Sequence, residues 1–366
     1  VGSEMCIRDR LEKEPFVLQG TLGTLSNNQE TGEPLPVNFQ LSSADINATL
    51  QGVIDDPLRG QGLNINVKAN VKEVSKFAEI FSDGVPKLGD LQLDFTLHGD
   101  YSAPGADSID FKLLRGQQAS LIASGSVANV INGTGLDLKF DGKSTDPALL
   151  SWLLFNKYDL MQALQFKGTL LGDMENISLK AIEASAETAN HFKVRLNGDV
   201  DSWKTKRKLT SKDAKLKLQF SAPTLDAIPM IDLDYIPNMQ AVFGSAMVAF
   251  SRREIGVYAS RILGGEQNQN QLLLSGDIGR ITLEDNSHVT GLALKIDIDL
   301  VDLAELNELV NYQIPDIGSL QLHGDLVSQD SKLHLNNTQV DIGLKDGTKL
   351  IAKGKASVSI SCLLYT

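Results

Sequence analysis

Cysteine is almost absent from this sequence of 366 residues. Its two cysteines, Cys6 and Cys362, lie near opposite ends. Residues 1–10 and 361–366 do not continue the pattern of the sequence beside them, and we interpret both stretches as adapter-like artefacts translated from sequencing adapters. The body between them, residues 11–360, then has no cysteine, so it has no disulfide or thiol chemistry. We also expect this body to be a fragment of a longer protein.

Basic charge and long apolar runs are scarce as well. The net charge is −12 and the pI about 4.9, which argues against binding to nucleic acid or to an anionic membrane surface, because both require a basic face. The one basic cluster, residues 204–217, is interpreted as a solvated hairpin tip, with contact to lipid head groups or to a partner as the alternative. The sequence has no run of about 18 apolar residues, so it predicts no membrane-spanning helix.

Motifs of catalysis and metal binding are missing. The histidines are His98, His191, His288, His323 and His334, and their spacing matches no zinc motif. The sequence has no nucleophile elbow, phosphate-binding loop or dinucleotide-binding motif. Asp297 and Asp299 alternate with isoleucines, so we interpret them as solvated charges and not as an acid–base pair. The sequence therefore predicts no catalytic residue, no metal, no cofactor and no enzymatic activity.

The clearest pattern that is present lies in residues 291–325. Apolar residues first occupy every second position from Leu292 to Leu300, which places them all on one face of a β-strand. Asp302 and Glu305 then have the spacing of a capping box before an apolar run, which predicts about two turns of helix. A turn with a proline follows, and the alternation resumes in a second strand.

This order of strand, short helix and strand recurs along the chain. Alternating strands begin at intervals of 73, 79 and 77 residues, at Gly62, Gly135, Ala214 and Gly291. We expect short helices in the segments that follow, at residues 72–81, 146–155, 224–233 and 302–310. We expect each second strand to end near a glycine, at Gly99, Gly172, Gly244 and Gly324.

These patterns predict a mainly β protein. We expect one elongated, curled antiparallel sheet of about twenty strands, of roughly 5–6 residues and ~17–20 Å each, with about four short helices. The polar stretch at residues 26–36 is predicted to be a turn. The whole of residues 11–360 would form a single body built from repeat units of 73–79 residues.

Four short helices cannot cover the apolar face of so many strands. Either the sheet folds on itself, or it stays curled and leaves an apolar groove. A groove lined by aliphatic side chains would shelter the acyl chains of a lipid. The residues predicted to line it are Leu91, Leu93, Phe95, Leu97, Leu136, Leu138, Phe140, Leu216, Leu218, Phe220, Leu292, Leu294, Ile296, Leu320 and Leu322.

The repeat resembles the AsmA-like family of Gram-negative envelope proteins, the broad group that includes TamB and YhdP. The resemblance covers roughly residues 15–358 and is strongest at residues 275–325. It implies a repeating β-groove protein of the periplasm, anchored in the inner membrane by a segment that this fragment lacks. It also implies phospholipid transport between the inner and outer membranes and a role in outer-membrane biogenesis and homeostasis.

Three functions remain open from the sequence. The leading hypothesis is a lipid conduit that carries phospholipid or another acyl-chain lipid, with an outer-membrane protein as a partner. The alternative is an envelope scaffold or assembly factor whose sheet closes on itself and binds proteins through its edge strands. An adhesin-like β-solenoid is the third, and the short helices fit it poorly.

Overall fold

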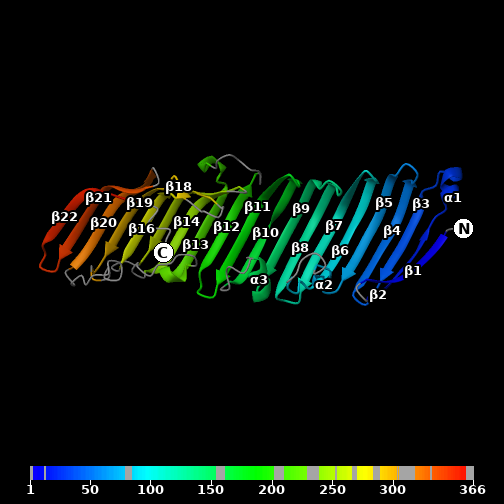
Figure 1. The fold of residues 1–366 in the computed structure, drawn as a ribbon, viewed down its shortest axis with the longest axis horizontal. Helices are drawn as coiled ribbons and strands as arrows, with labels where there is room; N and C mark the ends of the chain where they lie inside the picture. The colour runs from blue at the N-terminus through cyan, green and yellow to red at the C-terminus, as the bar shows by residue number, and fades with distance from the viewer. Residues whose placement is uncertain are drawn as a thin grey trace. The chain divides into compact units, whose positions relative to one another are not determined.

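The computed structural model describes residues 3–11, 14–78, 85–153, 161–201, 210–228, 239–251, 254–265, 270–282, 289–302, 304, 318–329 and 332–359. The protein is mainly β, and its paired strands are antiparallel (Figure 1). The chain divides into two compact units, Val1–Ala184 and Ser185–Thr366, called unit 1 and unit 2 below. The division falls within one strand, β11 (Asn176–Thr188).

Unit 1 contains an open antiparallel meander in which each strand from β1 to β10 pairs with the next along the chain. Its strands are β1 (Ser3–Leu11), β2 (Glu14–Leu22), β3 (Leu35–Ser42), β4 (Ile46–Asp56), β5 (Gln61–Val71), β6 (Asp90–Asp100), β7 (Ala103–Arg115), β8 (Ala119–Asn129), β9 (Thr134–Ser144) and β10 (Met161–Asp173). Most of the stretch interpreted as an artefact at the start of the chain thus forms β1. The stretch at residues 361–366 lies outside the described residues.

The strands are longer than the sequence suggested. Those of unit 1 have 8 to 13 residues, and β5, with 11, spans about 36 Å at about 3.3 Å per residue. The expected length of about 5–6 residues, which is the typical strand length in globular proteins, was therefore wrong.

Three α-helices belong to the described part of unit 1: α1 (Leu25–Thr31), α2 (Ser75–Ala78) and α3 (Pro147–Leu153). Two of them, α2 and α3, lie within segments predicted to be helical, and Asp146 caps α3 by accepting the Leu149 N–H at 2.9 Å. Helix α1 replaces a predicted turn. Its end is fixed by Gly32, which has a φ of 71° and donates its N–H to the Asn28 carbonyl, and the Asn28 side chain also donates to the Asp55 carbonyl at 2.9 Å.

Unit 2 is also built from antiparallel strands. Its strands are β12 (Lys193–Val200), β13 (Leu216–Thr224), β14 (Gln240–Phe250), β15 (Glu254–Gly264), β16 (Gln271–Asp277), β17 (Gly279–Thr282), β18 (Val289–Thr290), β19 (Ala293–Leu300), β20 (Gly318–Gln329), β21 (Lys332–Leu344) and β22 (Lys349–Ser359). Strand β15 pairs with β16 along its second half and with β17 along its first half. The sheet then continues from β16 to β19 and on to β22.

The described part of the third predicted helix, residues 224–228, contains a single 3₁₀ turn, η2 (Leu225–Ala227), and the rest of that segment lies outside the described residues. One expectation about unit 2 was wrong. Gly244 and Gly324 lie inside β14 and β20 and do not end them. Most of the fourth predicted helix, residues 302–310, lies outside the described residues. A second 3₁₀ turn, η1 (Ser211–Asp213), lies within the basic cluster of residues 204–217.

A local backbone feature recurs in four strands. The sixth residue of each of β7, β11, β15 and β21 has a positive φ although it is not glycine. These residues are Ser108, Ala181, Ala259 and Asn337, at intervals of 73, 78 and 78 residues. The pairing register of β7, β15 and β21 shifts beside these residues, as it does at a β-bulge.

Candidate functional site

One face of the sheet in unit 1 is apolar across consecutive strands. Residues paired across an antiparallel ladder point to the same side, so the register identifies this face. We call it the apolar face of unit 1. One row of paired residues crosses it from β2 to β10, through Leu18, Leu41, Ala48, Ala69, Leu93, Phe111, Ala123, Phe140 and Gly168.

Unit 2 has an apolar face of its own. Its central row crosses from β12 to β20 through Val194, Phe220, Gly244, Ile262, Leu274, Ile296 and Gly324. A neighbouring row continues from β15 to β22 through Gly264, Leu272, Ile298, Leu322, Val340 and Ala352. No charged residue interrupts either row.

The fifteen side chains predicted to line a groove divide between these two faces. Unit 1 contributes those of β6 and β9: Leu91, Leu93, Phe95, Leu97, Leu136, Leu138 and Phe140. Unit 2 contributes those of β13, β19 and β20, together with the residue just before β19: Leu216, Leu218, Phe220, Leu292, Leu294, Ile296, Leu320 and Leu322. Leu216 is 1% exposed, and the other fourteen are half-buried.

The prediction left out most of each face. Leu18, Leu41 and Phe111 in unit 1 and Ile262 and Leu274 in unit 2 lie in the same rows as the predicted residues. Their strands show the same alternation of apolar and polar residues, so this signal was available in the sequence. What the sequence does not show is the register that aligns one strand with the next.

Fully buried clusters occupy only parts of these faces. In unit 1, Leu35, Val37, Ile54 and Ile65 pack together across β3, β4 and β5. Helix α3 packs against β10 and buries Leu150 completely. In unit 2, η2 contributes to a cluster with these buried members: Ala222, Leu225, Ala227, Met239, Val242 and Leu300. The half-buried leucines and phenylalanines outside these clusters remain in contact with solvent.

Phenylalanine rings cover glycines on the neighbouring strand at several points of the apolar faces. Phe166 lies over Gly142 in unit 1, and Phe220 lies over Gly244 in unit 2. A Cβ atom added to Gly142 would lie 2.3 Å from the Phe166 Cζ, so a larger residue would require the ring to move. Phe166 also packs against Phe140, with ring centroids 6.0 Å apart. Each of these glycines therefore leaves room for a phenylalanine ring from the neighbouring strand.

The opposite face of each sheet is polar. In unit 1, Lys68 and Asp94 form a cross-strand ion pair of 3.0 Å, and Asn66 donates to the same carboxylate at 3.0 Å. The hydrogen bond from Lys68 and then that from Asn66 lower the pKa of Asp94 below its usual value. In unit 2, the predicted solvated charge of Asp297 lies 2.6 Å from the Nδ1 of His323. Each sheet therefore separates charge and apolar surface between its two sides.

Two cavities among the described residues lie outside the central rows. One, of about 430 Å³, lies beside α1 and includes Asn27, Asn28 and Glu33 in its lining. Another, of about 140 Å³, lies in unit 2 and includes Lys212 and Asp213. Within the described ranges, histidine, cysteine, aspartate and glutamate form no group of three that could hold a metal ion. Neither cavity suggests a specific chemistry.

Comparison with known proteins adds no relative: no family model, no curated protein and no solved structure matches the chain. None of the helices in the described segments combines the length and the apolar character needed to cross a membrane. Any functional assignment therefore depends on the geometry of the two apolar faces and on the sequence pattern.

Proposed function

We propose that this protein is a non-enzymatic lipid-handling protein whose apolar sheet faces hold the acyl chains of phospholipids. The observation that supports the proposal is that fourteen of the fifteen side chains predicted to line a groove are only half-buried. They lie in unbroken apolar rows that the described helical segments cover only in part. A sheet that served only as a closed scaffold would bury these residues against a second layer.

The energetics of lipid transfer favour such a surface. Moving a lipid with about 30 methylene groups through water would cost on the order of 25 kcal/mol, at about 0.8 kcal/mol for each group. Specific ligand pockets usually combine an apolar lining with a few converging polar groups. The central rows contain aliphatic side chains, phenylalanine and glycine, which suits acyl chains of varying structure better than a ligand with defined polar groups.

The location and partners follow from the resemblance to the AsmA-like family. We propose that the intact protein is periplasmic and anchored in the inner membrane. It would conduct phospholipid between the inner and outer membranes and so support outer-membrane homeostasis. A protein of the outer membrane would be its partner at the far end.

The test places a charge on each apolar face. In the variant Phe140→Asp with Leu294→Asp, phospholipid that co-purifies with the protein should fall to background when measured by mass spectrometry, and transfer between vesicles should stop. The matched control is Lys139→Gln with Lys295→Gln, which alters net charge by the same amount at neighbouring exposed positions. The control should keep both lipid binding and transfer. Circular dichroism should show the same β signal for all three proteins.

Two results would contradict the proposal. The first is a wild-type protein that carries no lipid and transfers none. The second is a charged variant that keeps its fold and transfers lipid at the wild-type rate. If the wild type has no lipid and the charged variant unfolds, the scaffold alternative becomes the better explanation.

A further inference from the structure

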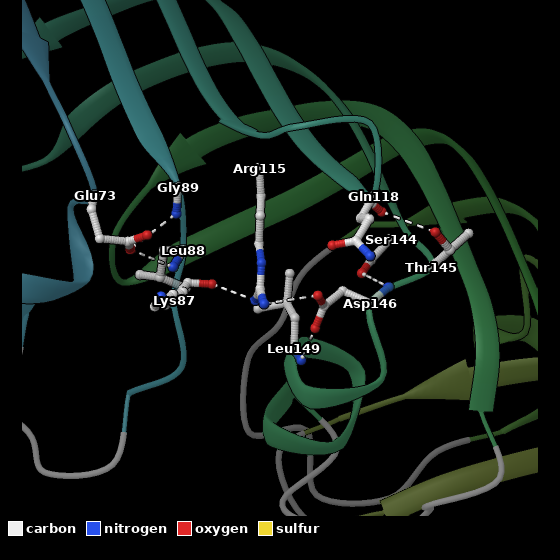
Figure 2. A network of polar contacts seen from close by, with 10 residues as sticks. All are labelled: Glu73, Lys87, Leu88, Gly89, Arg115, Gln118, Ser144, Thr145, Asp146 and Leu149. Carbon is white, nitrogen blue, oxygen red and sulfur yellow. Dashed lines mark hydrogen bonds and ion pairs between the residues drawn. The ribbon is translucent and has the colours of Figure 1, made fainter.

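The β7–β8 hairpin of unit 1 contacts two segments that are remote from each other in sequence (Figure 2). One is residues 85–89, which lead into β6, and the other is residues 145–149, which lead into α3. Arg115 at the end of β7 reaches both. Its Nη1 donates to the Lys87 carbonyl at 2.5 Å, and its Nη2 lies 2.9 Å from the Asp146 Oδ2.

The contact with Asp146 is well shielded from water. The Asp146 side chain is 6% exposed and that of Arg115 is 23% exposed. Both carboxylate oxygens are used, because Oδ1 caps α3 while Oδ2 pairs with Arg115. The Gln118 carbonyl of the same hairpin accepts the Thr145 N–H at 2.8 Å. A guanidinium suits this position because its fork of donors can bind two acceptors at once.

The first segment is also tied to the turn that precedes α2. The Glu73 Oε1 accepts the N–H groups of Leu88 and Gly89 at 3.0 and 3.2 Å. Polar contacts therefore run without a gap from Glu73, through residues 87–89 and Arg115, to Asp146 and the first turn of α3. Figure 2 shows these groups along one edge of the sheet.

We propose that Arg115 is a latch that couples the two segments, so that residues 85–89 and the first turn of α3 loosen together. Because Leu150 on α3 is fully buried, this coupling controls whether the end of the apolar face beside β10 stays covered. The final residues of β11, β15 and β21 are Thr188, Gly264 and Leu344, and none of these provides the cation that Arg115 provides at the end of β7. The inference does not depend on lipid binding.

The test measures hydrogen exchange at individual amides in the full chain. Asp146→Asn keeps a good helix cap but removes the ion pair. Exchange should become about tenfold faster at the Leu149 amide. It should accelerate by the same factor at the Leu88 and Gly89 amides, although Asp146 does not contact them. A factor of this size corresponds to the loss of one charged hydrogen bond. As a control, Lys167→Gln removes an exposed ion pair with Glu183 elsewhere in unit 1 and should change neither segment.

A second variant separates coupling from stability. Arg115→Lys keeps a cation for Asp146 but cannot bind two acceptors in the same way. Leu149 should then exchange within about twofold of its wild-type rate, while Leu88 and Gly89 exchange about tenfold faster. The latch is refuted if Asp146→Asn affects only α3. It is equally refuted if Arg115→Lys leaves Leu88 and Gly89 protected as in the wild type.

Discussion

Gly244 offers the sharpest test of how the apolar face of unit 2 is packed. An added Cβ at this position would lie 2.0 Å from the Phe220 Cε1. The Phe220 ring cannot move away freely, because it packs against Phe192 at a centroid distance of 5.9 Å and against the buried cluster around η2. Gly244→Ala should therefore displace the ring and lower the free energy of unfolding by about 1–3 kcal/mol, the usual cost of overpacking.

The change is measured by urea unfolding followed by circular dichroism. Gly354→Ala is the matched control, since Gly354 also lies in a strand but has no atom within 4 Å of its added Cβ. Combining Gly244→Ala with Phe220→Leu should cost less than the sum of the two single changes, because the smaller side chain relieves the overlap. Equal effects of Gly244→Ala and Gly354→Ala would refute the packing described here.

Two further predictions concern unit 1. Leu150 is completely buried, so Leu150→Ala should lower the free energy of unfolding by about 2–5 kcal/mol. The control is Leu58→Ala, at a side chain that is 64% exposed, which should cost less than about 0.5 kcal/mol. Similar losses for the two variants would contradict the packing of α3. Burial raises the pKa of Glu73, but hydrogen bonds from Ser75, Gly89 and Leu88 together lower it below the usual value of a glutamate. The ionised Glu73 therefore contributes stability above the usual pKa of a glutamate, and this contribution is lost as the pH falls through the lowered pKa. The difference in urea midpoint between the wild type and Glu73→Ala should shrink on acidification. A difference that does not depend on pH would refute this prediction.

The mainly β fold could be predicted because alternation with a period of two is a direct consequence of strand geometry. It identified the strand around Leu294 and the polar character of Asp297 on the opposite face. It could not set the ends of the strands, because a glycine such as Gly244 has the same local preferences whether it ends a strand or lies under a neighbouring side chain. Pairing with the next strand decides between the two, and pairing is a property of the whole sheet.

The polar contacts around Arg115 in unit 1 show a second limit of prediction from the sequence. The role of Asp146 as a helix cap was predictable, since a cap and its helix are neighbours in sequence. Its partner Arg115 is not a neighbour, and neither Arg115 nor Glu73 belongs to a recognisable motif. Helix α1 was missed for a similar reason, because the contact from Asn28 to the Asp55 carbonyl joins residues that are distant in sequence. Patterns within a short stretch of sequence predict contacts only between residues that are close in the sequence.

The recurrent positive-φ residues extend this argument to the repeat itself. A non-glycine residue in this region costs roughly 1–2 kcal/mol, so four of them at the same strand position need a common cause. Ser108, Ala181, Ala259 and Asn337 share no side-chain chemistry, and the sequence alone does not single them out. What they share is their place, the sixth residue of a strand, at intervals close to those between the alternating strands of the sequence. A bulge adds twist to its strand. The register shifts beside Ser108, Ala259 and Asn337, so we expect added twist to recur at these three positions, although their side chains differ.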